Sequence, residues 1–173
     1  YGDVIVFNFS TIFTSIKVSI LASLTTMIIS LPISFFAVKY KSKFSLLIEK
    51  ISYIGFGLPG IVIGLSLVYF SINFLFPIYQ TTAVLIFGYS VLFLQVGVSA
   101  IKSTLVQLNP NLEDASRGLG YSYWKTFIKV TVPLLMPSIL AGSLLIFLLT
   151  MKELPLTLVL SPLNFSSLPT SIW

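Results

Sequence analysis

Long apolar stretches alternate with short polar breaks along this chain. The apolar stretches run from about Ile16 to Val38, Ile51 to Phe76, Thr82 to Ile101 and Leu134 to Met151. A helix of about 20 apolar residues crosses the hydrocarbon core of a bilayer, which is about 30 Å thick. Because each stretch is close to this length or longer, the pattern predicts about four transmembrane helices. The expected fold class is therefore all-α, a polytopic transmembrane helical bundle.

The polar breaks predict what lies between these helices. Residues Lys39 to Lys50 are basic and interrupted, which indicates a water-exposed loop beside the lipid headgroups. Pro77 to Gln80 indicates an uncharged turn, and Lys102 marks the end of the third helix. We call the longest break, Asn109 to Val132, the elbow. The proline-containing remainder, Leu154 to Trp173, indicates a loop or a re-entrant segment.

Composition agrees with an integral membrane protein. Hydrophobic residues make up 56% of the chain and charged residues only 9%, and the mean hydropathy is +1.02. A soluble domain of similar length needs far more polar surface. Cysteine and histidine do not occur, which excludes disulfides, thiolate metal sites, Ser-His triads and histidine general bases. We expect no catalytic residue, no metal site and no enzyme. Because the sequence begins at Tyr1 and stops at Trp173 without a polar tail, we expect a fragment or a trimmed chain.

Charge gives the bundle an orientation. Ten Lys and Arg against five acids give a net charge of +5, which in a membrane protein reports topology and not a nucleic-acid partner. If the helices alternate in direction, most cations fall on one side, namely Lys39, Lys41, Lys43, Lys50, Lys102, Arg117, Lys125 and Lys129. Lys17 and Lys152 fall on the other side. Cytoplasmic loops carry the excess of Lys and Arg, so we expect the elbow in the cytoplasm and the N-terminus outside.

The first part of the elbow has the residues that begin and end a helix. Asn109 suits the N-cap and Pro110 the first helical position, while Glu113 and Asp114 suit the positive end of the helix dipole. The run Gly118-Leu119-Gly120 supplies the stop. A helix of about ten residues, near 15 Å long, is therefore predicted.

Side-chain spacing within the elbow predicts its contacts. Glu113 and Arg117 lie four residues apart, which predicts an ion pair on one helix face. A narrow small and apolar face follows the same helical spacing: Leu112, Ala115, Ser116 and Leu119. The aromatic and basic run from Tyr123 to Val130 predicts a segment at the headgroup level, with Pro133 beginning the next membrane helix. From these features alone, an interfacial anchor explains the elbow equally well.

A longer spacing within the elbow resembles a known family. Asp114-Ala115-Ser116 is followed after three residues by Gly120, and after nine more by Val130-Thr131-Val132-Pro133. This resembles the EAA loop of ABC-type importer permeases, whose pattern is Glu-Ala-Ala, three residues, Gly, nine residues and Ile-x-Leu-Pro. Glu113 stands as an extra acid before the motif. Asp for Glu, Ser for Ala and Val for Ile and Leu leave charge and size nearly intact.

The resemblance implies a type I ABC importer permease fold, with residues 1–173 forming a single, incomplete transmembrane domain. The elbow, residues 109–132, would be its cytoplasmic coupling helix, docked in a groove of a separate ATPase. The residues implied in coupling are Glu113, Asp114, Ala115, Ser116, Arg117, Gly120 and Pro133. The chain has no Gly-x-x-x-x-Gly-Lys-Ser/Thr phosphate loop, so no cofactor is expected on it, and ATP and Mg would bind to the ATPase.

A second resemblance concerns the solute. Lys152-Glu153-Leu154-Pro155-Leu156-Thr157, with Pro162, Phe165 and Leu168 to Trp173, resembles the corresponding segment of ferric-iron permeases, and Gly57-Leu58-Pro59-Gly60 resembles the same group. Ferric iron is therefore the implied solute, while thiamine, polyamine, sulfate and phosphonate permeases share the architecture and stay open. The implied partners are two ATPase subunits, a second permease half, identical or fused, and an extracytoplasmic solute-binding protein, all at a bacterial inner membrane.

Two features predict the translocation pathway. Gly57, Pro59, Gly60 and Gly64 weaken or bend the second helix, and a broken helix lines a pathway with backbone carbonyls, although close packing alone also explains them. Lys152-Glu153 is either a pair at the membrane surface or a carboxylate that meets a cationic solute or the binding protein. A secondary transporter driven by an ion gradient is the alternative from another class. It needs paired ionisable residues in mid-membrane, and none is evident.

Overall fold

The computed structural model describes residues 9–40, 42–109 and 111–162. Its long helices are α1 (Phe9–Lys39), α2 (Lys43–Gly57), α3 (Gly60–Phe74), α4 (Thr82–Gln107) and α7 (Val132–Met151). The shorter elements are the 3-10 turn η1 (Phe76–Ile78), α5 (Asn111–Gly118), α6 (Tyr123–Thr126), the π-helical turn η2 (Phe127–Thr131) and α8 (Pro155–Leu160). Every regular element in these ranges is helical, which confirms the predicted all-α class.

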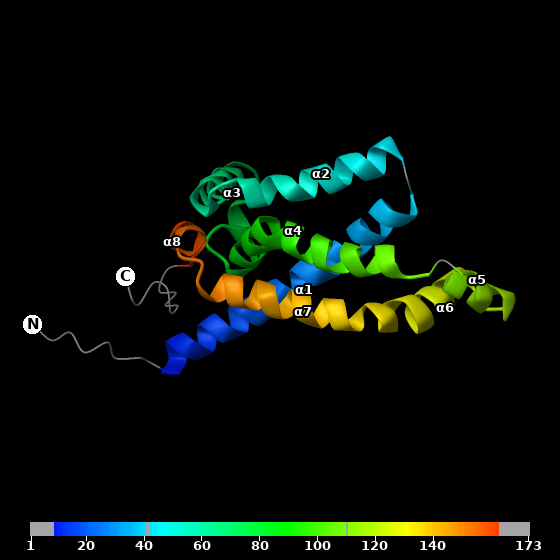
Figure 1. Cartoon of the computed structure of the whole chain (residues 1–173). Coiled ribbons are helices and arrows are strands. Elements are labelled where there is room, and N and C mark those ends of the chain that lie inside the picture. Colours follow the sequence, from blue (N-terminus) through cyan, green and yellow to red (C-terminus); the bar gives the residue numbers. More distant parts are fainter. Residues whose placement is uncertain (1–8, 41, 110, 163–173) are drawn as a thin grey trace, which may run out of the picture.

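Three helices form the centre of the bundle. α1 packs along both α4 and α7, and α4 and α7 pack on each other. α2 lies along α4, whereas α3 crosses the end of the bundle and packs on α8 (Figure 1). α5 and α6 lie at the opposite end (Figure 1). The two ends of the bundle therefore carry different structures, with α3 and α8 at one end and the elbow at the other.

The helices are long enough for a membrane protein. Within the described ranges, three segments are long and apolar enough to cross a membrane, namely Thr11–Lys39, Thr82–Gln107 and Tyr123–Met151. α2 and α3 together make a fourth only as a broken span, because the chain bends by 109° between them. The bend falls from Gly57 to Gly60, where the sequence predicted a weak or bent helix, and Pro59 there has no N–H to continue the helix.

Two helix ends differ from the prediction. α2 begins at Lys43, inside the basic break that was expected to be a loop, because Ser42 caps the helix by accepting from the N–H of Ser45 at 3.1 Å. α4 does not end at Lys102 but continues past it. Lys102 forms an ion pair with Glu49 of α2, so its charge has a partner within the bundle. Lys102 therefore marks a contact between two helices and not a helix end.

The fourth span begins at Tyr123 and not at Pro133. α6, η2 and α7 together form one span of 29 residues that ends at Met151. Proline has no N–H, and its ring crowds the carbonyl four residues earlier, so an unbroken α-helix is strained there. The wider π-helical turn at Phe127–Thr131 lies directly before this position and relieves that crowding. The predicted headgroup segment is thus the start of the span itself.

The proline-containing remainder after α7 begins with a short helix. Pro155 occupies the first turn of α8, a position where a missing N–H costs nothing. Leu156 and Leu160 of this helix are buried, so a loop, one of the two predicted alternatives, is wrong for this part, while a re-entrant segment stays a prediction. Residues 163–173, which include Phe165 and Leu168 to Trp173, lie outside the described residues, as do Lys41 and Pro110.

Small polar residues bring α1 close to its neighbours. The stripe of buried hydroxyls along α1 includes Ser19, Ser23, Thr26, Ser30 and Ser34. Ser34 donates to the carbonyl of Val98 on α4 at 3.2 Å, and Ser30 donates to Thr26 in its own helix at 2.7 Å. A Cβ placed on Gly97 of α4 would lie 2.3 Å from Ser30 Oγ. Helices in lipid associate through such small residues, and this contact was not predicted from the sequence.

Candidate functional site

α5 begins with the predicted cap. Asn109 Oδ1 accepts from the N–H of Asn111 at 3.0 Å, which is the geometry of an N-cap. Glu113 and Asp114 lie in the first turn and Arg117 in the last, where each charge complements the helix dipole. The helix has 8 residues, slightly fewer than predicted.

The chain leaves α5 through a left-handed glycine. Gly120 has a φ of 85°, and its N–H donates to the carbonyl of Arg117 at 2.9 Å. The N–H of Tyr121 donates to the carbonyl of Ser116 at 3.3 Å. These bonds close the helix and confirm the predicted stop. A Cβ on Gly120 would meet no atom within 4 Å, so the backbone conformation alone requires glycine.

Hydroxyl groups fasten α5 to the start of the last span. Ser116 Oγ and Thr126 Oγ1 lie 3.0 Å apart, and both residues are buried. Thr131, which lies five residues further into the last span than Thr126, donates through Oγ1 to Glu113 Oε1 at 3.4 Å. Because the helical segment runs on from Tyr123 to Met151, α5 is attached directly to a membrane-crossing helix.

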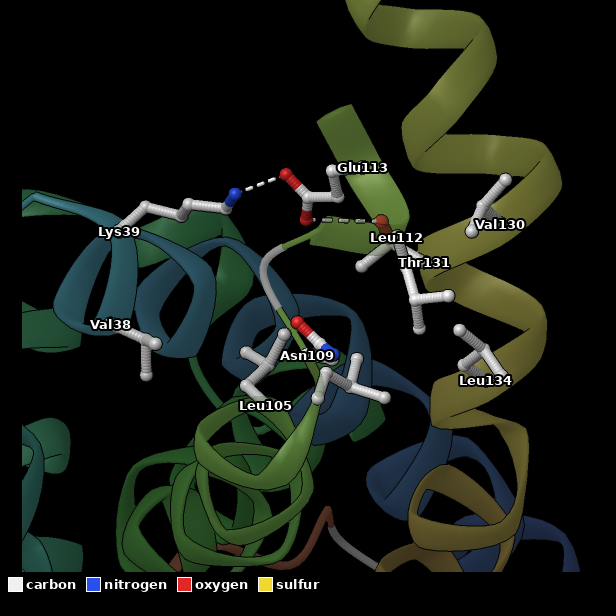
Figure 2. Close-up of a pocket in the computed structure, with 10 residues that line it drawn as sticks. Val38, Lys39, Leu105, Asn109, Leu112, Glu113, Val130, Thr131 and Leu134 are labelled. Carbon is white, nitrogen blue, oxygen red and sulfur yellow. Dashed lines mark hydrogen bonds and ion pairs between the residues drawn. The ribbon is translucent and has the colours of Figure 1, made fainter. Parts of the chain in front are cut away.

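Glu113 points toward the bundle and not along α5. Its Oε2 forms an ion pair with Lys39 Nζ at the end of α1 (Figure 2). The predicted pair with Arg117 does not form among the described residues, where Glu113 is bound by Lys39 and Thr131 instead. The side chains of Lys39 and Glu113 are only 35% and 20% exposed, so this pair is less screened by water than a surface pair. Two partners on the bundle side explain why Glu113 turns inward.

A cavity of about 180 Å³ lies between α5 and the bundle (Figure 2). Its lining comes from α1, α4, the link between α4 and α5, α5 and the start of the last span: Val38, Lys39, Leu105, Leu108, Asn109, Leu112, Glu113, Val130, Thr131 and Leu134. Figure 2 shows the Glu113 carboxylate between Lys39 and Thr131 along one side of this space. This cavity therefore separates α5 from α1 and α4. The Glu113 carboxylate lies at the edge of the cavity, where it binds Lys39 of α1.

The outer face of α5 is exposed. Asp114, Ala115 and Arg117 are exposed, and the Leu119 side chain is 82% exposed. The predicted small and apolar face is therefore divided, since Ser116 is buried against α6 while Ala115 and Leu119 face outward. Of the residues predicted for coupling, Pro133 lies in the first turn of α7 and is exposed.

At the other end, α3 packs on α8 through glycines. A Cβ on Gly60 would lie 2.5 Å from Glu153 Oε1, and one on Gly64 would lie 3.1 Å from Val159. Glu153 Oε1 also accepts from the N–H of Leu156 at 3.4 Å. The structure thus brings together Gly60, Gly64 and Glu153 from the predicted pathway set.

The other predicted pathway residues make no such contact. A Cβ on Gly57 would meet nothing within 4 Å, and the side chains of Pro59 and Lys152 are exposed. In the part of the chain that the structure describes, no group of 3 or more His, Cys, Asp or Glu gathers as a metal site. The arrangement at this end is a carboxylate beside a helix break.

At each end of the bundle, the sequence did not predict one contact between distant residues. Lys39 lies 74 residues from Glu113, and no local spacing connects them. Tyr89 of α4 and Thr157 of α8 share a buried hydrogen bond of 2.5 Å, again between distant parts of the chain. A lysine at the end of a membrane helix and an acid in the next polar break on the same side are the only signals that pointed to the first pair.

Comparison with known proteins identifies the family. The family described as binding-protein-dependent transport system inner membrane component matches residues 30–171. The chain belongs to this family of transport permeases. The match covers all the described helices except the first two-thirds of α1, so both the elbow and the helix break lie inside it.

Individual permeases are similar over most of the chain. The Fe(3+)-transport system permease protein FbpB 2 of Haemophilus influenzae is 35% identical over 159 residues, which cover 92% of this chain and 31% of that protein. The spermidine/putrescine transport system permease protein PotB of Salmonella typhimurium is 28% identical over 81% of this chain and 54% of that protein. A putative 2-aminoethylphosphonate permease, PhnV of Salmonella typhimurium, is 28% identical over 73% of this chain and 48% of its own length. The chain spans about a third to a half of these permeases.

Proposed function

We propose that this chain forms the solute pathway of an ATP-driven importer and that the elbow couples this pathway to a separate ATPase subunit. ATP and Mg bind to that ATPase, and the permease itself is not catalytic. The single observation that carries the proposal is the attachment of the exposed helix α5 to the unbroken segment Tyr123–Met151. A push on α5 reaches the membrane through one continuous helix.

The exposed residues of α5 suit a protein partner. Asp114 corresponds to the acid of the EAA pattern and is free to meet a cation of the ATPase, while Arg117 offers the opposite charge. Leu119 supplies an apolar side chain at the tip of the helix. Interfaces combine buried apolar anchors with charged residues that fix the register. Glu113 is engaged inside the permease by Lys39, so we assign the docking role to Asp114, Arg117 and Leu119.

The helix break and Glu153 mark the pathway end. The chain breaks between Gly57 of α2 and Gly60 of α3, and broken helices can line a pathway with backbone carbonyls. The carboxylate of Glu153 beside Gly60 favours a cation. Ferric iron is the first solute to test, because the iron permease FbpB 2 is similar over 92% of this chain. A polyamine and thiamine, whose thiazolium ring is positively charged, are also cationic, whereas sulfate and the phosphonate group are anions that this carboxylate would repel.

The assembly follows from the same reasoning. Two permease halves, identical or fused, surround the pathway, two ATPases bind the elbows, and an extracytoplasmic binding protein delivers the solute. The elbow end of the bundle faces the cytoplasm, because Arg117, Lys125 and Lys129 lie there and cytoplasmic segments carry the excess of cations. The end with α3 and α8 then faces the binding protein across a bacterial inner membrane.

The test is ATP hydrolysis by the permease and its ATPase in lipid vesicles, stimulated by binding protein loaded with ferric ion, spermidine or 2-aminoethylphosphonate. Asp114→Asn is expected to reduce the stimulation, because it removes the charge that meets the ATPase. Lys17→Gln is the matched control, since it removes one exposed charge from α1 near the opposite end. The solute whose binding protein stimulates ATP hydrolysis is identified as the transported substrate.

A different outcome would identify the rival class. If the permease binds no ATPase and takes up solute when a proton or sodium gradient is applied, the chain belongs to a secondary transporter in function and the proposal is wrong. If spermidine stimulates and ferric ion does not, the coupling stands and the solute is a polyamine.

A further inference from the structure

The way in which α5 is attached to the bundle is asymmetric. Its packing contacts fall on α6 and η2, the elements that continue into α7. Toward α1 and α4 it faces the cavity of about 180 Å³. The side of α5 that faces α1 therefore depends on long side chains that reach across the hollow.

One ion pair makes this connection. Lys39 Nζ at the last residue of α1 binds Glu113 Oε2, and Glu113 Oε1 accepts at the same time from Thr131. A single carboxylate thus joins three segments, namely the end of α1, the first turn of α5 and the turn before α7 (Figure 2). Lys39 also lies over the ring of Phe35, 5.8 Å from its centre, which holds the lysine stem against α1.

We propose that Lys39 and Glu113, which we call the clasp, are positioning residues that transmit the movement of the elbow to α1. The clasp deepens the proposed function and rests on it for its role in transport. Without the clasp, α5 stays attached to the last span through Ser116 and Thr126 but loses its direct connection to α1, whose Phe35 still contacts Tyr123 and Phe127. Because α1 packs along α4 as well as α7, the clasp lets one small helix move the centre of the bundle as a unit.

This assignment separates two neighbouring acids. Asp114 faces outward and is available to the ATPase, whereas Glu113 faces the bundle. A change at Asp114 therefore acts on ATPase binding, while a change at Glu113 acts on the movement of the bundle once the ATPase is bound. Loss of the clasp is expected to leave ATP hydrolysis running while transport falls.

The structure supplies a matched control. Lys102 of α4 pairs with Glu49 of α2, and the side chains are 32% and 15% exposed, close to the values for the clasp. That pair joins two membrane helices and does not touch α5. Breaking it removes an interhelical ion pair of the same kind without changing the attachment of the elbow.

The first measurement uses the permease alone. A spin label at Leu119→Cys reports on α5, and the chain has no cysteine of its own to compete for the label. Glu113→Gln and Lys39→Met are expected to increase the mobility of this label, whereas Lys102→Met leaves it unchanged. Equal mobility in all variants, or an increase with Lys102→Met as large as with the clasp variants, overturns the clasp whatever the ATPase does.

The second measurement uses the complex in vesicles and records solute uptake and ATP hydrolysis in the same sample. Glu113→Gln and Lys39→Met are expected to lower uptake per ATP by about threefold or more, the size of effect that residues within a coupling network produce. The charge-reversed double variant Lys39→Glu with Glu113→Lys restores most of it, because the pair is rebuilt. A residue that only stabilises the fold lowers uptake and hydrolysis together.

The two measurements separate the clasp from the proposed function. If the clasp variants keep the normal uptake per ATP, or if the reversed pair does not rescue, the clasp is wrong although the importer assignment stands. If no ATPase binds but the label on α5 is released by Glu113→Gln, the clasp holds as a brace of the elbow and the importer assignment fails.

Discussion

The two ends of this bundle are built on different principles. At the elbow end, α5 is held by polar groups, namely the clasp and the Ser116–Thr126 contact, around a cavity. At the other end, α3 and α8 meet directly through Gly60 and Gly64. Polar contacts that span a hollow let a helix move as a body while staying attached, whereas close glycine packing fixes the distance between two helices. This difference is consistent with the proposed roles, in which the elbow moves with the ATPase and the end with α3 and α8 lines the pathway.

The largest effect is expected where a side chain meets backbone in the packed part. A Cβ on Gly55 of α2 would lie 2.3 Å from the carbonyl oxygen of Val91 on α4. Because this oxygen belongs to the backbone, it cannot move aside unless the two helices separate. Gly55→Val should therefore destabilise the bundle by about 3 kcal/mol. The check is the thermal unfolding midpoint in detergent, with Gly118→Ala as control, since a Cβ on Gly118 meets nothing within 4 Å. A similar loss in both variants would mean that the contact between α2 and α4 is no more tightly packed than the elbow.

The next effect concerns the exposed tip of the elbow. Leu119→Asp should weaken ATPase binding by about 2 kcal/mol, which is the loss expected when a central apolar anchor of an interface is removed. The unfolding midpoint should not change, because Leu119 is 82% exposed in the permease alone. Binding of the purified ATPase to the immobilised permease measures this directly. Undiminished binding would place the ATPase contact elsewhere.

The smallest effect concerns the turn after α5. Gly120→Ala should cost about 1 kcal/mol of stability, since alanine is strained at the positive φ and no atom is crowded. Gly120→Asn should cost less, because asparagine tolerates this conformation better than alanine. Unfolding midpoints of both variants check the order. If alanine is as well tolerated as asparagine, the left-handed turn does not hold the elbow in place.

Local chemistry allowed much of this structure to be predicted. Capping by Asn109, the stop at Gly120 and the weak point from Gly57 to Gly60 depend on residues close together in the sequence, and each appears where it was expected. Helix length and hydropathy likewise predicted the spans, apart from the broken one. These features need no knowledge of which helix lies beside which.

Two of the errors have a common physical cause. Lys102 was taken to end a helix and Glu113 to pair within its own helix, but both charges found partners on other helices. The π-helical turn at Phe127–Thr131 let a helix run through the approach to Pro133, which the sequence alone suggested was a start. Contacts between distant segments decide the partners of the two charges, and a single sequence does not reveal them. The π-helical turn is local, but no residue pattern in the sequence signalled it.

The most direct test of the central claim is site-specific photo-crosslinking of the assembled transporter. A photoreactive residue is placed at Leu119, at the tip of the elbow, or at Phe74 of α3, which is also largely exposed at 69% but lies at the end of the bundle with the helix break. If the elbow docks on the ATPase, position 119 crosslinks to the ATPase and position 74 does not. A crosslink to the ATPase from position 74, or none from position 119 in a complex that hydrolyses ATP, would contradict this docking.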